Sequence, residues 1–190
     1  MSNDPLVWWE SLIERDFLYL LEFDQAVLSY REQPFRISYT FEGKRHVYTP
    51  DLLVQRTDKK QIIEVKPTKK LLNEDFIKFC RIISAVCQDQ GYEFIVATDT
   101  AIRVQPRLNN IKLFWRYSRI PIHPQCHTYC REFFSGVPNC RSASVEEILL
   151  FFSSKGFGSE VVYALIYWGH ILIDLMVPFN ETSIVYHSAL

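Results

Sequence analysis

The chain has 190 residues, of which 48% are hydrophobic and 23% charged, and its formal net charge is −1. This composition excludes a disordered tail and predicts a globular protein with one domain and a small appendage. The charge is unevenly divided: residues 144–190 hold one lysine against five acids, a net of −4, which leaves residues 1–143 at +3.

Residues 5–28 predict a long helix, because apolar side chains recur there at helical spacing. Glu14 lies among these apolar rows, where a partly desolvated carboxylate would need a cation. Alternatively, Glu14 is a solvated acid that the helix dipole favours, and Glu10 or Glu22 takes its place. From Val27 to Tyr48 the pattern becomes strand-like, with apolar and polar side chains alternating from Phe35 to Phe41 and a turn at Glu42-Gly43.

Residues 48–69 predict a hairpin of two apolar strands that nevertheless carry charges. If its loop is residues 56–59, Asp51 lies opposite Glu64, with Cβ atoms about 4.5–5.5 Å apart. Glu64 and Lys66 share one face because side chains alternate along a strand. Facing carboxylates repel unless a cation lies between them, and Mg²⁺ or Mn²⁺ suits their oxygens.

Lys66 is then placed to help deprotonate an attacking water or to stabilise charge on a phosphate. The alternative is a surface hairpin whose Glu/Lys ion pair has no chemical role. Residues 73–90 predict a helix that Gly91 ends, and residues 93–98 a buried strand parallel to the preceding one through a right-handed crossover. The expected architecture is therefore α/β, a mixed sheet with helices on both faces.

Residues 100–131 contain six basic residues and no acid, a pattern that favours contact with phosphates. A solvated basic face on a core helix is the alternative. Lys112, Arg116 and Arg119 would share a helical face at i+4 and i+7 spacing. The residues predicted to contact DNA are Lys69, Lys70, Arg103, Arg107, Lys112, Arg116 and Arg119.

Residues 121–143 are rich in proline and glycine and predict a linker. Residues 144–190 predict a small winged-helix-like module, with two helices followed by two short strands and with Ser144 and Glu147 as a capping box. Because this module is acidic, phosphates would repel it, and we expect it to bind a protein.

The N-terminus shows no signal-peptide pattern, and the apolar run 161–177 is short for a membrane span. Five cysteines, an odd number, agree with a reducing compartment, so we expect a cytoplasmic, bacterial protein with no membrane segment. Cysteines and histidines cluster between residues 123 and 140, but their spacing fits no common zinc motif, and we predict no zinc site.

Pro50-Asp51, twelve residues and then Glu64-Val65-Lys66 resemble the PD-(D/E)XK core of restriction-endonuclease-like nucleases. A longer set of motifs resembles the TnsA family of transposon endonucleases over about residues 10–120: Ser11-x-x-Glu14, Gln33-Pro34, Tyr48-Thr49-Pro50-Asp51, Glu64-Val65-Lys66-Pro67 and Leu108-Asn109-Asn110-Ile111-Lys112. This resemblance implies a restriction-endonuclease-like domain at residues 1–120 that is a Mg²⁺- or Mn²⁺-dependent endodeoxyribonuclease. Its implied catalytic residues are Glu14, Asp51, Glu64 and Lys66, and its implied metal ligands are Asp51, Glu64, the Val65 carbonyl and Glu14.

The resemblance also implies a transposase subunit that hydrolyses the non-transferred strand at the 5′ ends of a mobile element during cut-and-paste transposition. Implied partners are duplex DNA at the transposon ends, a DDE-type transposase similar to TnsB, and an AAA+ ATPase regulator similar to TnsC, bound through residues 144–190. The alternatives are a stand-alone restriction or junction-resolving nuclease, which would cut without partners, and a non-catalytic adaptor that binds DNA and a regulator.

Overall fold

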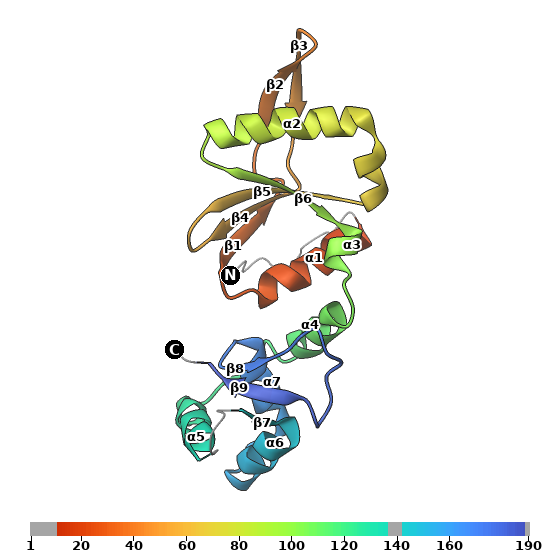
Figure 1. Ribbon diagram of the computed structural model, residues 1–190. Coiled ribbons are helices and arrows are strands. Elements are labelled where there is room, and N and C mark those ends of the chain that lie inside the picture. The colour runs from red at the N-terminus through yellow and green to blue at the C-terminus, as the bar shows by residue number, and fades with distance from the viewer. Residues whose placement is uncertain (1–10, 137–141, 189–190) are drawn as a thin grey trace. The chain divides into compact units, whose positions relative to one another are not determined.

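The protein is described by a computed structural model, which covers residues 11–136 and 142–188 (Figure 1). The chain divides into two compact units, Met1–Arg103 and Val104–Leu190. The sequence predicted the boundary near residue 120. It lies earlier because α4 (Arg107–Trp115) packs against α7 (Ser159–Tyr167) within the second unit.

The first unit is a mixed sheet with a helix on each face (Figure 1). Strand β5 pairs antiparallel with β4 and parallel with β6, and β1 pairs antiparallel with β4 at the other edge. Helix α1 covers one face and α2 the other, as expected for the α/β core. Its elements are α1 (Leu12–Phe23), β1 (Val27–Glu32), β2 (Ile37–Phe41), β3 (Lys44–Tyr48), β4 (Leu52–Arg56), β5 (Lys60–Lys66), the 3₁₀ helix η1 (Thr68–Leu72), α2 (Glu74–Asp89), β6 (Glu93–Thr98) and α3 (Asp99–Ile102).

The first helix is shorter than the predicted range 5–28. It ends at Phe23, where the Asp24 side chain accepts a hydrogen bond from the Ala26 N–H (3.0 Å) and turns the chain. Val27–Glu32 form β1, which pairs antiparallel with β4 at one edge of the sheet. The apolar residues at this position fit either period, and pairing across the sheet decides between them. The predicted start at residues 5–10 lies outside the described residues.

The predicted register of the charged hairpin is confirmed. Gln55 pairs with Lys60 and Leu52 with Ile63, and the same register places Asp51 opposite Glu64. One face of the hairpin packs against α1 through residues such as Leu52 and Ile63, and the other packs against α2. By alternation, Asp51, Glu64 and Lys66 belong to the α2 face.

Strands β2 and β3 form a separate two-stranded ribbon. Its turn is Glu42-Gly43, as predicted, and both residues have positive φ (49° and 73°), which a tight hairpin turn requires. Helix α2 begins where the Asn73 side chain accepts a hydrogen bond from the Phe76 N–H (2.8 Å), and Gly91 (φ 78°) follows its end. The predicted helix 73–90 and the parallel strand after it are therefore confirmed.

The second unit packs helices against a small antiparallel sheet of order β7-β9-β8. The predicted capping box is present, since the Ser144 side chain accepts from the Glu147 N–H and Glu147 accepts from the Ser144 N–H. Besides α4 and α7, its elements are α5 (Pro124–Ser135), β7 (Ser142–Ser144), α6 (Val145–Ser154), β8 (Ile171–Ile173) and β9 (Ile184–His187).

The predicted linker 121–143 is wrong in its described part. Residues Pro124–Ser135 form α5, which buries Cys126, Cys130 and Phe134 and packs against α6 and β9. Pro124 lies at the first turn of the helix, where proline is favoured, so it marks a helix start and not a linker. Within the described residues, the helices are all too short or too polar to cross a bilayer.

Candidate active site

Two carboxylates converge on one ammonium group at the end of β5. Lys66 Nζ lies 2.8 Å from Glu64 Oε1 and 3.2 Å from Asp51 Oδ2. Asp51 Oδ2 also accepts a hydrogen bond from the Val65 N–H at 2.7 Å, which ties this carboxylate to the neighbouring strand. The Glu64 side chain is only 6% exposed, against 24% for Asp51 and 31% for Lys66. Glu64 is thus shielded from solvent, whereas solvent and ligands can reach Asp51 and Lys66.

Tyr48 is a member of this cluster to which the sequence analysis assigned no role. Its hydroxyl donates a hydrogen bond to Glu64 Oε2 at 2.5 Å. Its ring packs edge-on against Phe79 of α2, with ring centroids 5.0 Å apart. Both oxygens of Glu64 therefore have a donor, Tyr48 on one and Lys66 on the other. The signal available in the sequence was the position of Tyr48 three residues before Asp51.

The electrostatics of the cluster follow from its burial. Burial raises the pKa of the Glu64 carboxyl and the Asp51 charge raises it further, while hydrogen bonds from Lys66 and Tyr48 oppose the rise. For Lys66, burial lowers the pKa, but the two carboxylates outweigh it and the net pKa is raised. Lys66 is therefore an ammonium ion at neutral pH, suited to stabilise negative charge. The pKa of Tyr48 is raised by burial and by Glu64, so its phenol stays protonated and donates.

The donor set at this cluster fits a hard divalent cation. Asp51 and Glu64 supply carboxylate oxygens, the ligands that Mg²⁺ and Mn²⁺ prefer, and the repulsion that raises the pKa of Glu64 is what a cation would relieve. Asp51 and Glu64 form a pair and not a larger group. Across residues 11–136 and 142–188, no set of three or more His, Cys, Asp or Glu side chains is placed to hold a metal ion.

Glu14 is not brought into this cluster. It lies on α1, the helix that covers the sheet face opposite to Glu64, and its carboxylate accepts a hydrogen bond from the Ser11 hydroxyl at 2.9 Å. Ser11 in turn accepts from the Glu14 N–H, so the two residues cap the start of α1. A third-acid role for Glu14 stays a prediction.

The strand ends beside Lys66 are held by a threonine and aspartate network that sequence analysis missed. Asp99 Oδ1 accepts hydrogen bonds from the Thr68 N–H (2.7 Å) and the Thr68 hydroxyl (2.6 Å). These bonds hold the pKa of Asp99 below its usual value. They join the residues that follow β5 and β6, and so fix the backbone just after Lys66.

The predicted DNA-contacting residues are divided between the two units. Lys69 and Lys70 are exposed on η1. Arg103 is instead ion-paired with the nearly buried Asp16 of α1 (Nε to Oδ2, 2.7 Å), which indicates a structural role. The other four lie in the second unit: Arg107, Lys112, Arg116 and Arg119.

The expectation that Lys112, Arg116 and Arg119 share one helical face is wrong for Arg119. Helix α4 ends at Trp115 and the chain continues in turns, where Tyr117 and Ser118 donate to carbonyls only three residues back. The i+7 spacing therefore does not apply beyond the helix. Arg116 and Arg119 are exposed, and a DNA contact by either remains a prediction.

One comparison with known families bears on this site. Residues 24–99 match the family model of the TnsA-like endonuclease N-terminal domain. The TnsA-like segment contains Tyr48, Asp51, Glu64 and Lys66, but it does not contain Glu14. It spans less than half of the chain and supports a nuclease-type domain in the first unit. No curated protein matches the chain.

Proposed function

We propose that this protein is a metal-dependent DNA endonuclease that acts as a subunit of a transposase. In this proposal it hydrolyses the non-transferred strand at the 5′ ends of a mobile element, leaving a 5′-phosphate and a 3′-hydroxyl. The observation that carries the proposal is the convergence of Asp51 and Glu64 on Lys66 inside the TnsA-like segment. An ordinary surface hairpin would not bury Glu64 beside a second carboxylate.

The residues have distinct roles in the proposed hydrolysis. Asp51 and Glu64 would hold Mg²⁺ or Mn²⁺, and the Val65 carbonyl is the further proposed ligand. When bound, the cation supplies positive charge that polarises the phosphodiester and lowers the pKa of water. Lys66 is charged and stabilises the negative charge that develops on the phosphate as water oxygen attacks phosphorus and the bond to the 3′ oxygen breaks. Tyr48 holds the Glu64 carboxylate in orientation.

The second unit is proposed to bind partner proteins. Its order from α5 to β9 is helix, strand, helix, helix, strand, strand, which supports the winged-helix-like arrangement proposed for it. Its last 47 residues carry the net charge of −4, which disfavours phosphate binding there. An AAA+ regulator similar to TnsC is the proposed partner of residues 144–190, and a DDE-type transposase similar to TnsB is proposed to cut and join the other strand.

The test is strand-resolved cleavage of DNA that contains the element ends, in Mg²⁺ or Mn²⁺, with and without the partner transposase and ATPase. Wild type is compared with Asp51→Ala and Lys66→Ala. The matched controls are Asp58→Ala and Lys60→Ala, which remove an exposed acid and an exposed base from the same hairpin away from the cluster. Thermal melting of every variant identifies any that fail to fold.

Loss of 5′-end nicking in both cluster variants but not in the controls, with nicking dependent on the partners, is the expected result. Cutting by the isolated wild-type protein would instead support a stand-alone nuclease. Wild-type protein that assembles with its partners but never cuts, while the assembly still engages the DNA ends, would overturn the nuclease assignment in favour of an adaptor.

A further inference from the structure

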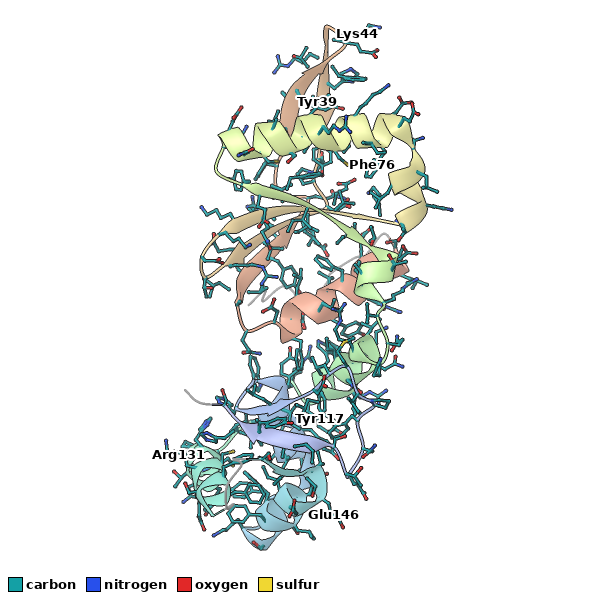
Figure 2. The ribbon with its side chains drawn as sticks, in the orientation of Figure 1. Tyr39, Lys44, Phe76, Tyr117, Arg131 and Glu146 are labelled. Carbon is teal, nitrogen blue, oxygen red and sulfur yellow. The ribbon has the colours of Figure 1, made fainter. Side chains whose placement is uncertain are left out.

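The β2–β3 ribbon extends beyond the core of its unit. Figure 2 shows Lys44 at its far end, past α2, with Tyr39 closer to that helix. Only the first residue of β2 and the last of β3, Ile37 and Tyr48, are buried. The ribbon therefore contributes Ile37 and Tyr48 to the core and packs Tyr39 against it, whereas Thr40 and residues 42–45 are exposed beyond that contact.

The two faces of the ribbon differ in chemistry. Tyr39 pairs with His46 on the inner face, where the rings stack (centroids 5.4 Å apart) and Tyr39 also meets Phe79 of α2 at 6.0 Å. The outer face follows from the alternation of side chains: it carries the pairs Ser38 with Val47 and Thr40 with Arg45, all exposed. This outer face presents hydroxyl and guanidinium groups.

The charge of the ribbon is positive. Arg36, Lys44 and Arg45 are exposed basic residues, and Glu42 in the turn is the acid among residues 36–48, all of which the structure describes. By alternation Arg36 and Arg45 belong to the outer face, whereas Lys44, the partner of Phe41, belongs to the face of Tyr39 and lies exposed at the end of the ribbon. Arg45 Nη2 donates a hydrogen bond to the Ser38 hydroxyl across the strands at 3.3 Å, which holds the guanidinium along the outer face. Basic and hydroxyl donors without an acid on that face complement phosphate oxygens.

The base of the ribbon is part of the candidate active site. Tyr48 ends β3 and donates to Glu64, and Asp51 follows three residues later. Lys44 lies four residues before Tyr48, about 14 Å along the strand at a rise of about 3.4 Å per residue. Base pairs in B-DNA also rise about 3.4 Å each, so the end of the ribbon reaches about four base pairs from the Glu64 site.

We propose that the β2–β3 ribbon grips duplex DNA, with Lys44 and Arg45 on phosphates about four base pairs from the bond that is cut. The inference rests on the proposed nuclease function and adds the surface that positions its substrate. A two-stranded ribbon fits the major groove of B-DNA, which is about 12 Å wide. Because the ribbon continues directly into Tyr48 and Asp51, its contacts with DNA would determine which phosphodiester lies against the Asp51, Glu64 and Lys66 side chains.

The test measures binding of the full chain to a 30-base-pair duplex by fluorescence anisotropy, in Ca²⁺ and at several salt concentrations. The variant Lys44→Ala/Arg45→Ala is compared with Lys59→Ala/Lys60→Ala, which removes the same charge from the end of the β4–β5 hairpin. Loss of two phosphate contacts should lower the slope of log affinity against log salt by about 1.8 and weaken binding on the order of tenfold. The control should bind as wild type does.

Four results would overturn the inference about the ribbon. Equal losses in the two variants would mean that net charge alone matters, which overturns the inference. A ribbon variant that binds and cuts like wild type overturns the inference and leaves the nuclease function standing. A ribbon variant that binds DNA normally but fails to assemble with the transposase would make the ribbon a protein-docking element, which also overturns it. Wild-type protein that does not bind the duplex would overturn the inference, whereas the nuclease proposal is decided separately by cleavage in the presence of the partners.

Discussion

Replacing Tyr48 with phenylalanine removes one hydroxyl from the candidate active site and keeps the ring that packs against Phe79. The hydroxyl donates to Glu64 Oε2, and this bond opposes the burial and the Asp51 charge that raise the pKa of the Glu64 carboxyl. Without it, Glu64 loses a donor, its pKa rises further, and less of it is ionised to bind a cation.

The size of the effect follows from the kind of bond that is lost. A hydrogen bond to a charged group contributes about 1.5–3 kcal/mol, which corresponds to a change of roughly 10- to 150-fold in an equilibrium constant. Partners that orient a metal-binding carboxylate typically change metal affinity by about 10- to 100-fold. We therefore expect Tyr48→Phe to weaken Mn²⁺ binding by at least about tenfold, with a larger loss at acidic pH than at neutral pH.

The assay is calorimetric titration of the full chain with Mn²⁺ at two pH values, with Tyr39→Phe as the matched control. Tyr39 lies on the same ribbon and packs against Phe79, but its ring stacks on His46 and not on the cluster. Equal Mn²⁺ affinity in wild type, Tyr48→Phe and Tyr39→Phe would refute the orienting role of Tyr48. A wild-type chain that binds no Mn²⁺ would refute the metal site itself.

Three further variants test the structure. Because the pKa of Glu64 in the folded protein is raised above 4.5, folding stability falls as the pH rises through that raised pKa. Glu64→Gln removes this ionisation and should therefore have a higher melting temperature than wild type at pH 7 without metal. Added Mn²⁺ should raise the melting temperature of wild type only. A lower melting temperature for Glu64→Gln contradicts this. Arg103→Ala should lower the free energy of unfolding in urea by about 1–2 kcal/mol, since the nearly buried Asp16 loses its 2.7 Å contact on Oδ2 and keeps Arg15 at 3.9 Å. The variant should leave the salt dependence of DNA binding unchanged, and a changed salt slope would restore a DNA role to Arg103. Ser144→Ala should cost about 1 kcal/mol in the same assay, and no change would argue against the capping box.

Short-range patterns in the sequence were sufficient for the centre of the site. The register of the β4–β5 hairpin follows from its loop length, and alternation along β5 places Glu64 and Lys66 on one face, so the convergence with Asp51 could be predicted. Helix α2, the turn before Lys44 and the capping box at Ser144 also depend on residues close in sequence.

Tertiary packing decided the rest, because contacts between residues distant in sequence leave no periodic signal. Tyr48 reaches Glu64 only because β3 and α2 set its ring against Phe79. Arg103 forms an ion pair with Asp16, 87 residues away in the sequence. The sequence had instead grouped it with the basic residues that follow it, as a predicted DNA contact. The predicted helix and the predicted strand overlapped at residues 27–28, and the β4 edge decided for the strand, because Val27 pairs with Arg56 across the sheet.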